Sequence, residues 1–511
     1  MVDDPTPATG AGRPDPERHF ETGHLKRDLG SRAARGAALT LASNGVRFLI
    51  EAARIIVLAR LLSPADYGLV AMVTVVTGFI GMFQDLGLNL ATVTRDRINH
   101  AQVSTLFWVN VAVGVLLVAA TAALAPLLAW FYSEPRLVAI TLAVAPTFLI
   151  VSLTVQHQAL LRRQMRFGIS SVIAIVSSLV GLLVGILMAW WGSAYWALVA
   201  MTIAVASTNL VAAWIAAPWR PGRPMRRVGT RELVRFGTHV TGTNLLNYFS
   251  RRLDHLLLGW WWGATVLGLY TKANSLVETP WNRALIPVGS VVIPSLSRLA
   301  GEPERYRASF LRILEKLALV VLPGAAFMIA SAQWLIPFLL GERWAEAAPI
   351  FGALAVLGLA RPIEVASLWL FMTQNRADQA LRWSTFGGLI AAVAVLVGLP
   401  WGGVGVAVAL AAVGLARIPL LVWYVTRSGP IRASDIYRSL SAPAFASAAA
   451  LLVLVLLNPK AAGMPPALVL GAGLGITGAV VMAILCILPS GRSALADAWS
   501  LLQLLRRQRP A

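Results

Sequence analysis

The sequence has few charged residues and almost no cysteine, and each shortage excludes a class of protein. Only 13% of the 511 residues are charged, whereas 57% are hydrophobic, and the mean hydropathy is +0.71. A soluble chain would need far more charge on its surface, so the composition is typical of a polytopic membrane protein. The single cysteine, Cys486, excludes an intrachain disulfide. The six histidines are scattered without metal-ligand spacing, so we expect no metal site and no cofactor.

Acidic residues are scarce relative to basic ones, with 23 Asp and Glu against 43 Lys and Arg. A nucleic-acid partner is not implied, because the arginines cluster in short loops between apolar runs, as membrane topology demands. The chain has no Gly-x-x-x-x-Gly-Lys-Ser/Thr motif, so no nucleotide-driven motor is predicted. Residues 473–478 match Gly-x-Gly-x-x-Gly, but they lie inside an apolar run and follow no strand. Small residues at that spacing are typical of close helix packing.

Apolar runs occupy most of the chain, and each is near the roughly 20 residues that a membrane-spanning helix requires. They lie at about 37–62, 67–93, 104–130, 136–157, 170–190, 195–216, 236–262, 264–296, 313–340, 348–372, 382–399, 403–426, 440–457 and 466–488. The sequence therefore predicts an all-α polytopic membrane protein with fourteen transmembrane helices.

The basic residues predict the orientation of these helices. With the N-terminus inside, thirty of the 43 Lys and Arg fall in inner loops and tails, and only Arg136, Arg343 and Lys460 fall in outer loops. The positive-inside rule then predicts that both termini are cytoplasmic. All outer loops are short, so no external domain is expected.

An internal repeat appears at an offset of 200 residues. Asn44, Arg47, Glu51 and Arg54 align with Asn244, Asn247, Arg251 and Asp254, and Gly68-Leu69 aligns with Gly268-Leu269. We therefore predict two pseudo-symmetric six-helix lobes, related by an axis along the membrane normal, plus two extra C-terminal helices. The predicted parts are a partly disordered tail at 1–36, an N-lobe at 37–216, a basic linker at 217–235, a C-lobe at 236–427, the last two helices at 440–488 and a basic tail at 489–511.

Ionisable residues inside the apolar runs mark the predicted site, because charge at membrane depth needs a wet cavity or a partner. The predicted substrate-binding residues are Arg47, Arg54, Arg251, Arg252, Lys272, Arg283 and Arg361. The candidates for proton or sodium coupling are Glu51, Asp85, Asp254, Glu278 and Glu364. The excess of basic residues implies an anionic guest, and arginine suits phosphate oxygens especially well. The polar stripes would also fit structural bonding between helices, and Asp85 equally fits a helix cap.

Four stretches carry a resemblance to a known family. They are Leu61-Leu62-Ser63-Pro64-Ala65-Asp66-Tyr67-Gly68, Arg251-Arg252-Leu253-Asp254 with Leu267-Gly268-Leu269-Tyr270, Pro294-Ser295-Leu296-Ser297-Arg298-Leu299, and Leu340-Gly341-Glu342-Arg343-Trp344. They resemble the polysaccharide-flippase branch of the multidrug/oligosaccharidyl-lipid/polysaccharide exporter superfamily, in particular its colanic-acid and lipopolysaccharide exporter group. The resemblance covers roughly residues 36–490.

The resemblance implies a flippase in the bacterial cytoplasmic membrane that works by alternating access. Its cargo would be an oligosaccharide on undecaprenyl diphosphate, and its partners would be the polymerase and glycosyltransferases of the same pathway. We expect no enzymatic activity of its own. A drug/cation antiporter of the same superfamily is a competing hypothesis, although a cationic guest would favour an acidic interior. A membrane glycosyltransferase or polymerase, and a non-transporting scaffold, are competing hypotheses from different functional classes.

Overall fold

The structure is a computed structural model that describes residues 29–84, 89, 92–93, 98–225, 230–458, 463–488 and 491–492. The side chains of residues 29–42, 230–247 and 249–251 lie outside that description. Within the described residues every regular element is a helix. The chain divides into two compact units. Unit 1 comprises Met1–Arg54 and Val76–Leu246, and unit 2 comprises Ile55–Val75 and Asn247–Ala511.

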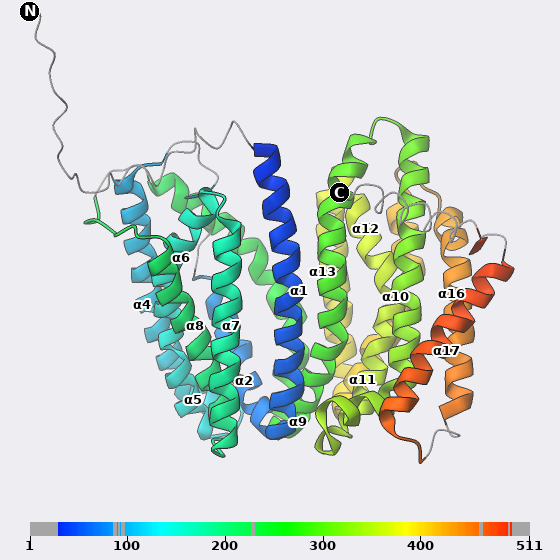
Figure 1. The fold of residues 1–511 in the computed structure, drawn as a ribbon, viewed down its shortest axis with the longest axis horizontal. Helices are drawn as coiled ribbons and strands as arrows, with labels where there is room; N and C mark the ends of the chain where they lie inside the picture. The colour runs from blue at the N-terminus through cyan, green and yellow to red at the C-terminus, as the bar shows by residue number, and fades with distance from the viewer. Residues whose placement is uncertain are drawn as a thin grey trace, which may run out of the picture. The chain divides into compact units, whose positions relative to one another are not determined.

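Figure 1 shows the helices of the described residues, which follow one another along the chain. They are α1 (Leu29–Leu61), α2 (Pro64–Gly81), α4 (His100–Phe131), α5 (Arg136–Val144), α6 (Pro146–Arg163), α7 (Phe167–Trp190), α8 (Trp196–Ala216), α9 (Thr230–Arg298), α10 (Pro303–Leu340), α11 (Ala347–Ala355), α12 (Arg361–Thr373), α13 (Ala377–Gly398), α14 (Gly402–Ala416), α15 (Ile418–Thr426), α16 (Ala433–Leu457) and α17 (Pro466–Ile487). Short 3₁₀ turns connect some of them: η3 (Glu342–Trp344), η4 (Val356–Leu359) and η5 (Leu399–Trp401).

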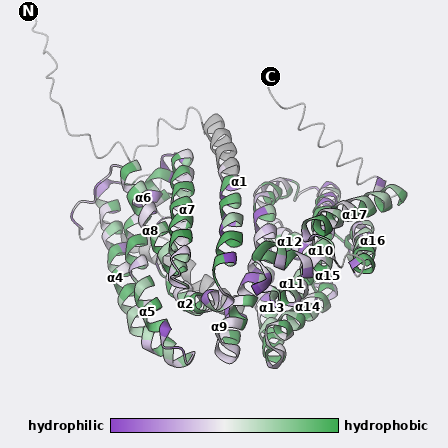
Figure 2. Cartoon of the chain, turned by 60° about the horizontal axis from the view of Figure 1, so that its bottom comes forward, coloured by the Kyte–Doolittle hydropathy of each residue, from purple (hydrophilic) through white to green (hydrophobic). Residues whose placement is uncertain are grey.

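The all-helical membrane fold is confirmed, but the count of fourteen spans is not. Nine stretches of the described chain are long and apolar enough to cross a membrane, or ten if the bent pair Ala347–Leu359 and Arg361–Thr373 is one span. One of the nine, Ala377–Thr426, runs from α13 to α15 and so combines two predicted segments. Neither α1 nor α9 is among them, because charged residues interrupt their apolar runs. Figure 2 shows α4, α5 and α7 mostly in the hydrophobic colour, whereas α1 carries hydrophilic bands.

Helix α9 is two helices that meet at Gly263. This glycine has φ +76° and ψ −172°, a conformation that other residues rarely adopt, and it interrupts an otherwise helical stretch of 69 residues. The predicted boundary between the segments 236–262 and 264–296 therefore falls where the structure has the kink. Pro280, Pro287 and Pro294 all lie inside the second half of α9.

Unit 1 is built around α4, α6, α7 and α8. Helices α4 and α6 pack together through a cluster that includes Phe107, Leu160 and Trp219, and α7 lies along α8 (Figure 1). A second cluster, with Leu161 and Ile173, joins α6, α7 and α8. On α1, the Ser43 hydroxyl donates to Ser171 of α7 over 3.0 Å.

Unit 2 contains the last two helices, which pack against α10 (Figure 1). The small side chains of Ala442, Ala446 and Ala450 on α16 allow close packing against α17, and they form one buried cluster with Val481 of that helix. Gly473 of α17 lies against Phe327 of α10, so that a Cβ at this position would stand 3.3 Å from the ring. Gly473 of the Gly-x-Gly-x-x-Gly match thus lies at a helix interface, as predicted, whereas a Cβ at Gly475 or Gly478 would meet nothing within 4 Å.

Two glycines of the internal repeat meet each other in unit 2. A Cβ on Gly68 would lie 1.7 Å from the backbone oxygen of Ala264, and a Cβ on Gly268 would lie 1.9 Å from that of Pro64. The two contacts are related by the same offset of 200 residues that relates the sequence stretches. Because only glycine leaves room for backbone at that distance, both positions require it for this crossing.

The stretches Leu61–Gly68 and Leu340–Trp344 form one junction in unit 2. Ser63 and Asp66 cap the start of α2 reciprocally, with Ser63 N donating to Asp66 Oδ2 over 2.9 Å and Asp66 N donating to Ser63 Oγ over 3.3 Å. Trp344 is fully buried and donates from Nε1 to Ala59 O over 2.8 Å. Arg60 donates to Phe338 O over 2.6 Å at the C-terminal end of α10. Much of the sequence that carries the family resemblance therefore has a structural role.

Candidate functional site

The candidate site lies in unit 2, where a tetrapeptide occurs twice. Gly-Leu-Ala-Arg stands at 358–361 and again at 414–417, followed each time by a proline, at Pro362 and at Pro419. Proline lacks an N–H, so a helix is interrupted or restarted near it. Helix α12 accordingly begins at Arg361, with a 44° bend from the preceding stretch, and α15 begins directly after Arg417.

The two glycines of the repeated tetrapeptide lie in close contacts with different neighbours. A Cβ on Gly414 would lie 2.5 Å from Leu357 Cδ2, and a Cβ on Gly358 would lie 2.9 Å from the Cβ of Ala325. A Cβ at Gly358 would thus meet α10, whereas a Cβ at Gly414 would meet the Leu357 side chain, directly before the first copy. Gly414 therefore lies next to the start of the first copy, and both arginines lie beside the same carboxylate.

Glu364 lies between the two arginines. Arg417 Nη2 donates to Glu364 Oε1, and Arg361 Nη1 stands 3.6 Å from Glu364 Oε2. The second distance is longer than a hydrogen bond, so Arg361 is attracted but not bonded. Arg417 Nε is buried and has no hydrogen-bond partner among the residues that the structure describes. The three side chains are partly exposed, at 30%, 23% and 24% for Arg361, Glu364 and Arg417.

These groups line a cavity of about 310 Å³ between α12, α13 and α15. Its wall includes two aromatic side chains, Phe371 and Trp383, and two hydroxyls, on Ser367 and Ser384. Trp383 is held in place by stacking on Tyr424, with ring centroids 5.6 Å apart. The cavity therefore combines a basic side with an aromatic one, and we call it the basic pocket.

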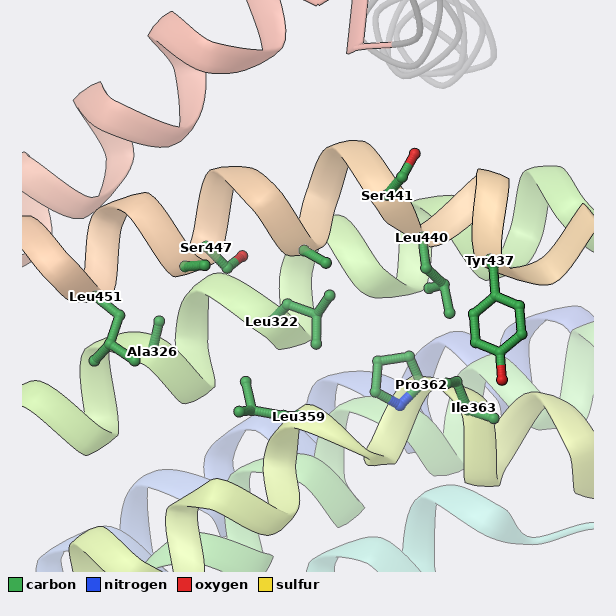
Figure 3. A pocket seen from close by; sticks show the side chains of 12 residues that line it. Leu322, Ala326, Leu359, Pro362, Ile363, Tyr437, Leu440, Ser441, Ser447 and Leu451 are labelled. Carbon is green, nitrogen blue, oxygen red and sulfur yellow. The ribbon is translucent and has the colours of Figure 1, made fainter. Parts of the chain in front are cut away.

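The opposite side of α12 faces a second cavity, of about 350 Å³, which we call the apolar pocket. Figure 3 shows its lining side chains, which come from α10, α12 and α16 and from the turn before α12. Most of them are aliphatic, such as Leu322, Ile363 and Leu451, and Tyr437 stands at one end. Pro362 and Ile363 line the apolar pocket, whereas Arg361 and Glu364 line the basic one. Helix α12 thus separates two chemically different cavities.

A further polar cluster in unit 2 surrounds Asp254. Its carboxylate accepts from His255 N and from the Tyr270 hydroxyl, each over 2.8 Å, and lies 2.8 Å from His255 Nδ1. Tyr270 and His255 are almost completely buried. This cluster joins the two halves of α9, since Asp254 precedes the kink at Gly263 and Tyr270 follows it.

The remaining predicted residues of unit 2 fall in different surroundings. Lys272 is buried, with Nζ 3.7 Å from the centre of the Tyr67 ring, in a cation–π contact. Arg252, Glu278 and Arg283 are exposed on α9. The side chain of Arg251 lies outside the described residues.

In unit 1 the predicted stripe lies on α1. Arg54 Nη2 bonds to Glu51 Oε1, one turn away, and the Arg54 side chain remains 40% exposed. Arg47 is half-buried one turn before Glu51. Asp85 lies outside the described residues. The binding and coupling roles of all these residues remain predictions.

Sequence reasoning missed Arg417. Along the chain it is only one basic residue inside the run 403–426, whereas the structure places it in the lining of the basic pocket, bonded to Glu364. The repeated Gly-Leu-Ala-Arg followed by proline is the signal that could have found it. The same signal pairs it with Arg361, which was predicted.

Membrane-length helices around a basic pocket and an apolar one define the class of this chain, a multi-pass helical membrane protein. Residues 57–349 match the family described as polysaccharide biosynthesis protein, and this chain belongs to that family. The resemblance to polysaccharide flippases drawn from the four sequence stretches is confirmed at this level.

The relatives and solved structures that are similar to this chain include the following three proteins. Teichuronic acid biosynthesis protein TuaB of Bacillus subtilis (strain 168) is 28% identical over 311 residues, which cover 60% of this chain and 64% of that protein, less than two thirds of its length. Lipopolysaccharide biosynthesis protein WzxC of Escherichia coli (strain K12) is 24% identical over 344 residues, covering 67% and 70%. In fold, the chain is similar to lipid II flippase MurJ in an inward closed conformation, with a TM-score of 0.70, 12% identity, and coverage of 89% and 98%.

Proposed function

We propose that this protein is a flippase for lipid-linked oligosaccharides in surface polysaccharide synthesis. It would turn an oligosaccharide on undecaprenyl diphosphate from the inner to the outer leaflet of the bacterial cytoplasmic membrane. The observation that carries the proposal is α12, which separates a basic pocket from an apolar one. A guest with a polar anionic head and an apolar tail needs both environments in one protein. Membership of the polysaccharide biosynthesis family and the similarity to WzxC support a guest of this class.

The apolar pocket is the proposed place for part of the polyprenyl tail. Its aliphatic lining offers a chain of isoprene units the contacts that lipid would otherwise supply, at no cost in unpaired polar groups. Helix α16, the first of the two helices outside the repeat, contributes much of that lining. This assigns a role to the C-terminal helices that the two-lobe repeat does not explain.

The diphosphate is proposed to meet the arginines of the two polar stripes, Arg47, Arg54, Arg251 and Arg252. Guanidinium groups bind phosphate oxygens through two parallel hydrogen bonds, and each costs roughly 2.5–3.5 kcal/mol to hold at membrane depth on insertion scales. Binding would favour one conformation of an alternating-access cycle if the anion contacts the arginines better in that conformation. Coupling to protons or sodium would involve carboxylates such as Glu51 and Asp254. The polymerase and glycosyltransferases of the same pathway are the proposed protein partners.

A drug or cation antiporter is the main competing proposal. The basic pocket argues against it, because two arginines face one carboxylate there and would repel a cationic guest. A glycosyltransferase or polymerase differs from a flippase in its products, so an assay that detects both movement and products separates the two.

The test is flipping by the purified chain in lipid vesicles. A fluorescent oligosaccharide on undecaprenyl diphosphate is placed in both leaflets, and a membrane-impermeant reductant then bleaches the outer label. We expect vesicles with the protein to lose nearly all fluorescence and protein-free vesicles to lose about half. Loss of only half in both samples would refute the flippase, and an extended or cleaved glycan, detected by mass spectrometry, would indicate an enzyme.

A further inference from the structure

We infer that the basic pocket between α12, α13 and α15 is a subsite for an acidic sugar of the cargo, in which Arg361 and Arg417 bind the sugar carboxylate. The inference rests on the proposed function and narrows its substrate class. The pocket volume of about 310 Å³ is at the lower end of the roughly 300–1,000 Å³ found for small-molecule sites. That size suits one sugar ring, whereas a whole repeat unit would not fit.

The net charge of the pocket favours an anionic ligand. Arg361, Glu364 and Arg417 are the charged residues of its lining, so among the described residues the pocket carries one net positive charge. A cation removed from water is costly unless an anion neutralises it. One additional carboxylate would balance the pocket.

Hydrogen-bonding capacity in the pocket is also incompletely used. Glu364 satisfies one amino group of Arg417, but Arg417 Nε is buried without a partner among the described residues. Arg361 stands 3.6 Å from Glu364, beyond hydrogen-bond length. A guest carboxylate can accept two parallel bonds from a guanidinium, and Arg361, which is 30% exposed, has donors that Glu364 leaves unbonded.

In the empty pocket the Glu364 carboxylate therefore takes the role that the carboxylate of a bound guest would take. The Glu364 carboxylate holds Arg417 in place, and an arriving carboxylate competes with it for the same guanidinium. This predicts opposite effects for the two partners. Removing the arginine weakens binding of the acid, and neutralising Glu364 strengthens it.

The rest of the lining suits a sugar ring. Trp383 offers a flat apolar surface for the C–H face of a pyranose, and the buried Phe371 and Ser367 form the wall beside it. Sites for small polar guests combine such apolar walls with a few placed polar groups. Because Trp383 is fixed by its stacking on Tyr424, that surface is already formed in the empty pocket.

Gly387 of α13 explains how the Arg417 guanidinium enters the pocket. A Cβ at this position would stand 2.8 Å from Arg417 Nη1. Substitution by alanine would displace the guanidinium without changing any charge. This gives a second test that is independent of removing the arginine.

The experiment measures binding of two matched probes to the purified full chain in detergent, by equilibrium dialysis. One probe is a radiolabelled disaccharide ending in glucuronic acid, and the other is its counterpart in which the carboxylate is reduced to the alcohol. We expect the acid to bind at least about tenfold more tightly, which is the lower end of what one charge-assisted hydrogen bond contributes. Equal affinity for the two probes would refute the subsite.

The variants test the assignment of residues. We expect Arg417→Gln and Gly387→Ala to lower the affinity for the acid about tenfold and to leave that for the neutral probe unchanged. Glu364→Gln should raise the affinity for the acid. The control is Arg382→Gln, an exposed arginine on α13 that does not line the pocket, which should have no effect. Thermal unfolding identifies any variant that fails to fold.

An unchanged affinity for the acid in Arg417→Gln would refute the inference, and so would a lower affinity in Glu364→Gln. If Arg417→Gln does not fold, Gly387→Ala and Glu364→Gln still test the inference, because neither removes the arginine.

A competing source of the anion is the diphosphate of the cargo. If undecaprenyl diphosphate without sugar displaces the acidic probe, and Arg417→Gln abolishes its binding, the pocket belongs to the diphosphate and the sugar-acid subsite is wrong. The flipping assay reports separately on the proposed function. Flipping without preference for the acid refutes only the subsite, whereas acid-selective binding without flipping refutes only the flippase.

Discussion

Basic residues serve several different purposes at the residue scale within unit 2. Arg60 bonds to the last carbonyls of α10, and Lys272 lies on the Tyr67 ring. Arg361 and Arg417 instead share one carboxylate beside an open cavity. Arg60 and Lys272 are engaged in contacts within the protein. The net basic charge of a sequence therefore overstates the charge that a guest can contact.

Removing one hydrogen bond from the Asp254 cluster is expected to lower the stability of the folded protein. Replacing Tyr270 by Phe removes one hydrogen bond to a buried carboxylate, which is worth about 1.5–3 kcal/mol for a charged acceptor. We expect a lower thermal unfolding temperature of the detergent-solubilised protein. Tyr437→Phe is the control, because that tyrosine is 46% exposed. Equal unfolding temperatures for the two variants would show that the hydrogen bond contributes nothing.

The proposed diphosphate site can be tested by reversing the charge of its arginines one at a time. Arg47→Glu, Arg54→Glu and Arg252→Glu should each reduce flipping in vesicles by more than tenfold while the protein still folds, because the new carboxylate repels phosphate. Arg438→Glu, a reversal at an exposed position of α16, should flip normally. Normal flipping by all three stripe variants would mean that the diphosphate binds elsewhere.

At the element scale, the crossing of α2 with the second half of α9 depends on two glycines. Each leaves space for a backbone oxygen of the other element, and the two contacts repeat at the offset of 200 residues. A backbone oxygen cannot move away from an added Cβ as easily as the end of a flexible side chain can. The crossing is therefore intolerant of any Cβ.

We expect Gly68→Ala and Gly268→Ala to force these elements apart. The cost should resemble that of overpacking, about 1–3 kcal/mol or more, and should appear as a lower unfolding temperature and lower yield of folded protein. The matched control is Gly475→Ala on α17, where a Cβ would meet nothing within 4 Å. If all three variants unfold at the same temperature, the close crossing is absent from the native protein.

At the scale of the whole molecule, α10 provides a test of membrane topology. It runs from Pro303 to Leu340, and 38 residues at about 1.5 Å each exceed the thickness of a bilayer core. Arg305 near its start and Arg343 just beyond its end are both exposed. The excess of basic residues predicts that the first is cytoplasmic and the second external.

Single cysteines at these two positions, in a chain with Cys486→Ser, measure that orientation. We expect Arg343→Cys to react with a membrane-impermeant thiol reagent applied to intact cells, and Arg305→Cys to react only after the cells are permeabilised. The reverse pattern would invert the topology and the proposed direction of transport with it.

The sequence by itself determined the class of fold and the order of the helices. Hydropathy acts along the chain, so apolar runs and their basic flanks predict helices without knowledge of packing. Gly263 at a segment boundary and the paired glycines at an offset of 200 residues are local features of this kind. The tertiary structure alone decided which charged residues meet. Arg361 and Arg417 share one carboxylate because the segment with Gly414 packs against Leu357, close to the start of α12. Lys272 is covered by Tyr67 because α2 packs on α9. Such contacts depend on which faces of distant helices pack together, and that is not encoded in the periodicity of any one segment.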